Sequence, residues 1–189
     1  MYVFRSLRLA SAPNVAHADR GYGRLSCQVF PDADLDQVVN GAAFASFIAS
    51  GQTCIMGARL LVHESVADEV TAKFVAKAKA IRCGPPMDMN TQMGPVISGP
   101  QLSKVSEFIQ IARDEGASVL CGGDRPEGLP DDLAKGYYFA PTVIGDVTPG
   151  MRIVQEEVFG PVVVVYTFKD EVRTLCRALP SHEAHVCVL

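Results

Sequence analysis

Two short runs of consecutive apolar residues most constrain the fold of this chain. Leu60, Leu61 and Val62 are adjacent within residues 59–63, and residues 162–165 are all valine within 162–168. A strand with one face in water alternates apolar and polar residues, whereas a continuous run is typical of a strand buried on both faces. Both runs therefore predict buried strands, and both are far shorter than the roughly 20 apolar residues of a membrane-spanning helix.

Apolar residues at helical spacing separate these strands. They predict helices over about 32–48, over about 65–81 and from 100 or 101 to Gly116, with further strands over 118–121 and 138–144. Pro31 suits a first helical position, and Ser65 with Asp68 resembles a capping box. This order predicts an α/β fold with a largely parallel sheet flanked by helices.

Charge and cysteine content exclude several classes of protein. The 189 residues carry a net charge of −4, whereas a nucleic-acid binder usually presents a basic face. The six cysteines never form a CxxC pair, and His182 and His185 are too close for an HExxH motif, so no metal site is predicted. Because the chain is long and apolar enough to fold without disulfides, we expect reduced thiols and a cytoplasmic location.

The first 28 residues differ from the rest in composition. They contain Arg5, Arg8, Arg20 and Arg24 but a single acid, Asp19. An arginine-rich, acid-poor N-terminus is typical of a mitochondrial presequence, which makes the mitochondrion the alternative location. A poorly ordered terminal segment is the other interpretation, because chain ends are usually loose unless they dock.

A cysteine flanked by glycines follows the first predicted helix. The segment runs Gly51-Gln52-Thr53-Cys54 and continues to Gly57. Glycines allow a backbone to approach a ligand closely, and loops on a rigid scaffold present reactive groups. A lone cysteine is also among the most buried residue types, so the pattern alone leaves a small core residue as the alternative for Cys54.

A second motif, 155–162, has the sequence Gln-Glu-Glu-Val-Phe-Gly-Pro-Val. On pattern alone it is a loop with two solvated acids that enters a buried strand.

Together these motifs resemble the NAD(P)-dependent aldehyde dehydrogenase family. The run 30–36 leading to Gly51-Gln52-Thr53-Cys54 resembles its active-site signature, and segments 93–97, 136–143 and 155–162 follow in the family's order. The resemblance covers residues 29–170 and implies the catalytic lobe of that fold, truncated. Residues 1–28 and 171–189 have no counterpart, so we expect an unmatched N-terminal segment and an unmatched C-terminal tail.

The resemblance implies a covalent chemistry and its residues. Cys54 matches the catalytic nucleophile, which forms a thiohemiacetal and then a thioester while an aldehyde is oxidised to a carboxylic acid. Glu157 and Phe159 match the residues that contact the nicotinamide side of NAD or NADP. The implied partner is a small-molecule aldehyde, with neither nucleic acid nor membrane. Homo-oligomers are typical of the family, although its oligomerisation strand is not seen here.

The sequence also departs from the family. Met56 stands where the family nearly always has a small residue. The general-base glutamate of a Glu-Leu-Gly-Gly-Lys-type motif is missing, since residues 19–27 contain no glutamate. The dinucleotide-binding domain has no counterpart either. The alternative function is therefore a truncated, non-catalytic family member that acts as an interaction module or is inactive.

Overall fold

The computed structural model describes residues 25–133, 135–169 and 186–188. Its centre is a six-stranded sheet with the strand order β3-β4-β5-β2-β1-β6. Every neighbouring pair is parallel except β3 and β4. The strands are β1 (Leu25–Val29), β2 (Gly57–His63), β3 (Ser118–Cys121), β4 (Thr142–Gly145), β5 (Val162–Phe168) and β6 (Val186–Val188). The predicted α/β fold with a largely parallel sheet is confirmed.

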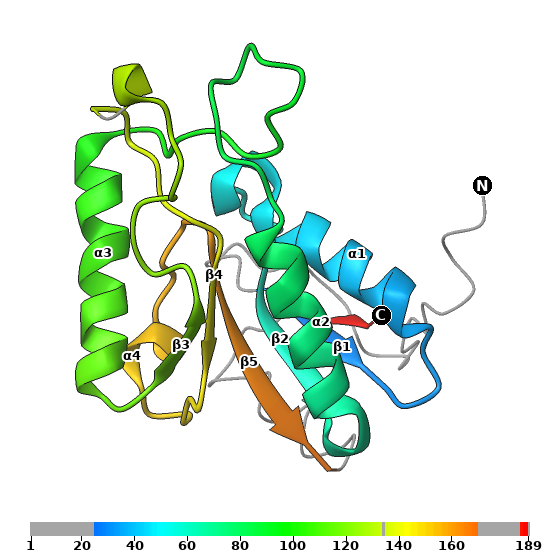
Figure 1. The fold of residues 1–189 in the computed structure, drawn as a ribbon. Coiled ribbons are helices and arrows are strands. Elements are labelled where there is room, and N and C mark those ends of the chain that lie inside the picture. The colour runs from blue at the N-terminus through cyan, green and yellow to red at the C-terminus, as the bar shows by residue number, and fades with distance from the viewer. Residues whose placement is uncertain (1–24, 134, 170–185, 189) are drawn as a thin grey trace.

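Helices cover both faces of this sheet (Figure 1). They are α1 (Leu35–Phe47), α2 (Ala67–Lys79), α3 (Gly99–Asp114) and α4 (Arg152–Gln155), with 3₁₀ turns η1 (Ile48–Gly51), η2 (Glu64–Val66) and η3 (Asp131–Leu133). None of the helices in the described residues is long and apolar enough to cross a membrane.

Strand β5 shows why its sequence is a continuous apolar run. Val163 and Val165 belong to the core cluster that includes Phe47 of α1 and Phe74 of α2. Val162 and Val164 belong to a second cluster, with residues of α3 and α4. Because successive side chains of a strand point to opposite faces, a strand between two helical layers needs apolar residues at every position.

Two helix starts differ from the sequence prediction. The N-cap of α1 is Asp34, whose Oδ1 accepts hydrogen bonds from the backbone N–H groups of Asp36 and Gln37, so Pro31 lies before the helix rather than at its first position. The predicted capping box of Ser65 and Asp68 is wrong: a 3₁₀ turn occupies 64–66, and its cap is the ring of His63.

Three strand assignments also differ. Strand β1 was not predicted, and residues 25–28 of the segment expected to be poorly ordered lie in it, between β2 and β6. Its buried Ser26 and Gln28 break the apolar pattern that identifies a buried strand. Strand β6 lies within the predicted C-terminal tail. The strand predicted over 138–144 begins only at Thr142, and the apolar Tyr138 and Phe139 are buried in the preceding loop.

Candidate active site

Cys54 lies in the loop that joins α1 to β2. The backbone is left-handed at three successive residues before it, with φ of 49° at Ala49, 58° at Ser50 and 68° at Gly51. A turn closed by the Met56 N–H and the Thr53 carbonyl, at 3.1 Å, then leads into β2. Each non-glycine residue in this conformation costs about 1–2 kcal/mol, so the surrounding structure must hold the loop in place.

The Cys54 side chain is exposed, so the interpretation of Cys54 as a core residue is wrong. Cys27 and Cys121 are buried. Burial raises the pKa of the Cys83 thiol to about 11 and also raises the pKa of Cys121, which keeps both in the unreactive thiol form. Among Cys27, Cys54, Cys83 and Cys121, Cys54 is therefore the one that a reagent in solution reaches most easily.

The two sequence motifs meet at their glycines. A Cβ atom placed on Gly51 would lie 2.1 Å from the carbonyl oxygen of Gly160 and 2.7 Å from the nitrogen of Pro161. Only a residue without a side chain allows this approach. The loop of Cys54 thus packs, backbone against backbone, on the turn that carries Phe159, although about a hundred residues separate the two in the sequence.

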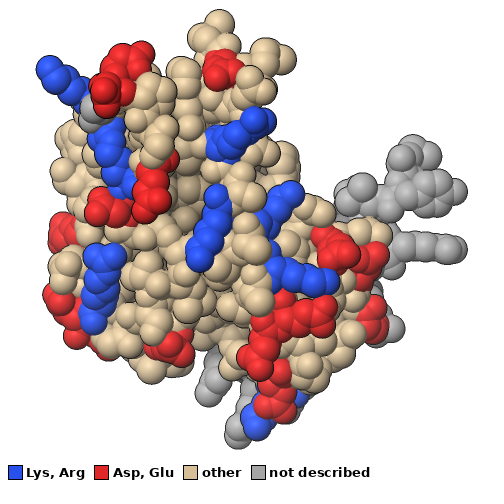
Figure 2. All heavy atoms as spheres, viewed as in Figure 1, with Lys and Arg blue, Asp and Glu red and all other residues tan. Residues whose placement is uncertain are grey.

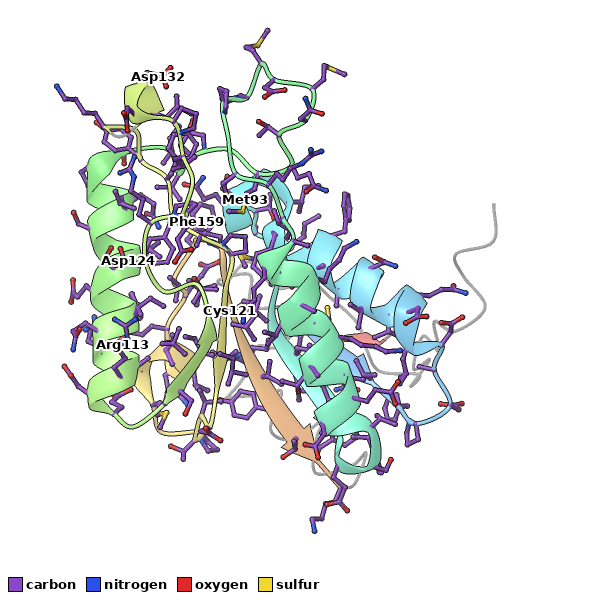
Figure 3. All side chains as sticks on the ribbon, in the orientation of Figure 1. Met93, Arg113, Cys121, Asp124, Asp132 and Phe159 are labelled. Atoms are coloured by element: carbon purple, nitrogen blue, oxygen red, sulfur yellow. The ribbon has the colours of Figure 1, made fainter. Side chains whose placement is uncertain are left out.

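Phe159 and Glu157 precede this contact on the loop between α4 and β5. Phe159 is itself left-handed, with φ of 57°. Helix α3 holds their backbone: Gln101 Nε2 donates to the carbonyls of Val158 at 3.1 Å and Phe159 at 2.7 Å, and Lys104 Nζ donates to that of Glu157 at 3.0 Å. Figure 3 shows Phe159 beside α3. Both side chains are partly buried.

The two acids of this motif have different surroundings. Glu156 is exposed and pairs with Arg152, with 2.6 Å between Nε and Oε1. Glu157 is half-buried. Both acids border a small cavity of about 20 Å³, together with Phe159 and Met56. The interpretation of two solvated acids therefore holds for Glu156 alone.

Met56, the departure from the family pattern, points into the protein. Its side chain is 1% exposed and borders the same cavity as Ile153 and Val164. The larger side chain thus fills interior space beneath the loop and does not crowd the surface beside Cys54. A flexible methionine suits such an irregular gap.

A third segment, residues 93–97, completes the site. Ser50 Oγ lies 2.9 Å from the Gly94 carbonyl oxygen and 3.2 Å from that of Pro95, and the Ile97 N–H donates to Gln52 Oε1 at 3.0 Å. Sequence reasoning found the segment as a family landmark but missed Ser50 and Gln101. The available signal in the sequence was the position of Ser50, which lies next to Gly51 of the first motif.

The described residues contain no group of three metal-binding side chains. His182 and His185 lie outside the described residues, as do residues 19–24 of the stretch in which the family's general base was sought. No metal role is assigned to any described side chain.

Comparisons with known proteins agree with these motifs. The model of the aldehyde dehydrogenase family matches residues 22–178, a stretch that begins before residue 29 and ends after residue 170. A chloroplastic betaine aldehyde dehydrogenase of Beta vulgaris is 46% identical over 149 residues, which are 79% of this chain and 29% of that protein. A chloroplastic aminoaldehyde dehydrogenase of Arabidopsis thaliana is 44% identical over 160 residues, 85% of this chain and 31% of that protein.

Solved structures show the same fold. A Burkholderia cenocepacia protein assigned as an aldehyde dehydrogenase superposes with a TM-score of 0.80 at 44% identity, over 83% of this chain and 32% of that one. The betaine aldehyde dehydrogenase of Staphylococcus aureus in complex with NAD⁺ superposes with a TM-score of 0.79 at 39% identity, over 84% of this chain and 31% of that one. This chain therefore spans about a third of the length of these relatives, and it belongs to the aldehyde dehydrogenase family.

Proposed function

We propose that this chain supplies the nucleophile and part of the cofactor contact of an NAD(P)-dependent aldehyde dehydrogenase. Cys54 is the catalytic residue, and Glu157 and Phe159 are cofactor-binding residues. The observation that carries the proposal is the close approach of Gly51 to Gly160, which brings the cysteine loop and the Glu157–Phe159 turn to one site.

The chemistry of the chain's own residues starts at the exposed thiol. The Cys54 thiolate adds to the carbonyl carbon of an aldehyde, and the backbone N–H of Cys54 stabilises the oxyanion of the resulting thiohemiacetal. Loss of a hydride from the same carbon leaves a thioester on Cys54. Water then hydrolyses the thioester to the carboxylic acid and restores the thiol.

A bound NAD(P)⁺ supplies the hydride acceptor. The residues present fit its nicotinamide side: Glu157 can accept hydrogen bonds from ribose hydroxyls, and the ring of Phe159 can pack on the nicotinamide end. Side chains of α3 bind the backbone carbonyls of Glu157 and Phe159, so the positions of these two residues at the site are fixed. Charge-assisted hydrogen bonds to a carboxylate are about twice as strong as neutral ones.

The substrate we propose is a small aldehyde. The names of the plant and Staphylococcus aureus relatives make betaine aldehyde and aminoaldehydes the first compounds to test. We propose a homo-oligomer, as is typical of the family. Both acidic and basic side chains lie on the face in Figure 2, and the chain carries a net charge of −4, which supports a partner other than nucleic acid.

For the compartment we propose the cytoplasm, with the mitochondrion as the alternative. Cys54, Cys83 and Cys121 form no disulfide within the described residues, which is compatible with a reducing compartment. A fluorescent fusion that keeps the natural N-terminus distinguishes the two locations.

The experiment follows NAD(P)H formation at 340 nm with the full chain, betaine aldehyde and either dinucleotide. We expect Cys54→Ser to abolish turnover and Cys83→Ser, the matched control, to retain it. Turnover that survives Cys54→Ser contradicts the assignment of the nucleophile. A folded native chain that neither reduces nor binds either dinucleotide overturns the proposed function and favours a non-catalytic interaction module.

A further inference from the structure

We propose that residues 94–101, here called the bridge segment, fix Cys54 relative to Phe159, and that Ser50 and Gln52 are the positioning residues through which they do so. This inference rests on the proposed function of Cys54 and Phe159. Neither Ser50 nor Gln52 is assigned a contact with substrate or cofactor. Both act through the bridge segment.

Ser50 ties the cysteine loop to the start of the bridge segment. Its side chain is buried, and its one hydroxyl proton is shared between the carbonyls of Gly94 and Pro95 at 2.9 and 3.2 Å. Ser50 also adopts a left-handed backbone, which favours glycine. Ser50 adopts this strained conformation while its hydroxyl binds the bridge segment. This indicates that the hydrogen bonds of the hydroxyl outweigh the free-energy cost of the backbone conformation.

Gln52 makes the second tie, two residues before Cys54. Its Oε1 accepts the hydrogen bond of the Ile97 N–H at 3.0 Å. Gln52 and Ser50 lie on either side of Gly51. Their hydrogen bonds therefore hold the cysteine loop on both sides of its contact with Gly160.

The bridge segment is itself anchored, so it can serve as a fixed reference. The Val96 N–H donates to the Tyr137 carbonyl at 2.9 Å, and the Val96 side chain is buried. Ser98 caps α3 through its contact with the Gln101 N–H. The far end, Gln101, then binds the carbonyls of Val158 and Phe159. One segment therefore contacts both halves of the site.

The test compares variants of the full chain by amide hydrogen exchange at residues 52–57 and at residues 94, 96 and 97. Ser50→Gly removes the hydroxyl and relieves the backbone strain, which offsets part of the stability lost with the hydrogen bond. Gln52→Leu removes the acceptor, whereas Gln52→Glu restores it. The matched control is Ser46→Ala, because Ser46 is equally buried and its Oγ donates to a carbonyl at 2.9 Å, but to Gly57 and not to the bridge segment.

The second readout is acylation of Cys54 by p-nitrophenyl acetate, which needs no cofactor. In this step the Cys54 sulfur displaces p-nitrophenolate and forms an acetyl thioester. Rates are compared at each variant's pH plateau, which removes the effect that the charge of Gln52→Glu has on the thiol pKa.

We expect Ser50→Gly and Gln52→Leu to speed exchange of the Ile97 amide about tenfold, the equivalent of one lost hydrogen bond. We expect acylation to slow in both variants, Gln52→Glu to restore both readouts, and Ser46→Ala to leave the Ile97 amide protected. The proposal is overturned if Ser50→Gly and Gln52→Leu leave the exchange rate of the Ile97 amide unchanged. It is also overturned if Ser46→Ala raises that rate by the same factor. A native chain that is not acylated overturns the proposed function alone, and the exchange rates still decide the role of the bridge segment.

Discussion

At the scale of single residues, Gly51 carries the contact between the two motifs. A Cβ atom there meets backbone atoms of Gly160 and Pro161, which cannot rotate away as a side chain can. We predict that Gly51→Ala destabilises the chain by more than about 2 kcal/mol and abolishes acylation of Cys54, because the loop must leave its place. Urea denaturation measures the loss of stability.

The matched control is Gly128→Ala. Gly128 is also left-handed, with φ of 71°, but its Cβ would meet nothing within 4 Å. This variant should lose only the backbone cost of about 1–2 kcal/mol and keep a reactive Cys54. Equal losses for the two variants would show that the close approach contributes nothing.

Cys83 gives the stability of the chain a dependence on alkaline pH. Its pKa is raised from 9.0 to about 11 by burial, so the unfolded chain ionises first. The contribution of this thiol is fully present below pH 9 and is lost as pH rises from about 9 to about 11. We predict that Cys83→Ser has a smaller decline of unfolding free energy over this interval than the native chain, measured by urea titrations at each pH. Parallel declines would contradict the raised pKa.

At the scale of elements, the N-cap of α1 tests the corrected start of that helix. Asp34 Oδ1 accepts from two backbone N–H groups, whereas Asp32 lies before the cap. We predict that Asp34→Ala costs about 1 kcal/mol of stability and that Asp32→Ala costs much less. If Asp32→Ala were the more destabilising, the helix would begin earlier, as Pro31 had suggested.

Elements with a strong apolar period could be predicted from the sequence. Strand β5 and helix α3 have their residues buried at the positions that the pattern indicates. Strand β1 could not be predicted, because Ser26 and Gln28 are buried within it and hide the apolar run. The kink of η1 was not predicted either, since Ala49 and Ser50 are not residues that favour a left-handed backbone.

The site could be predicted only in part. The order of motifs predicted Cys54, Glu157 and Phe159 as candidates, but not how their loops come together. That depends on the strand order, in which β5 lies next to β2, so that the loops before both strands lie at one edge of the sheet. Single-sequence patterns do not specify such an order, and Ser50, Gln52 and Gln101 gain their contacts only from it.

At the scale of the whole molecule, helices cover both faces of the sheet (Figure 1), and the chain spans about a third of the length of its relatives. The described residues bring an exposed thiol near the turn that carries Glu157 and Phe159. The bridge segment contacts the loop of the thiol, and α3 binds the backbone of the turn. The first covalent step needs only the thiol, its loop and a carbonyl compound, so we expect that step from this chain without a cofactor.

The most direct measurement is peptide mass spectrometry after brief exposure of the folded chain to p-nitrophenyl acetate. The account predicts an acetyl group on Cys54, matched by release of p-nitrophenolate, and little label on Cys27, Cys83 or Cys121, which are buried or have a raised pKa. Cys54→Ala should lose the rapid phase of release. An unlabelled Cys54 in the folded chain, or label that appears first on Cys27, Cys83 or Cys121, would contradict this prediction.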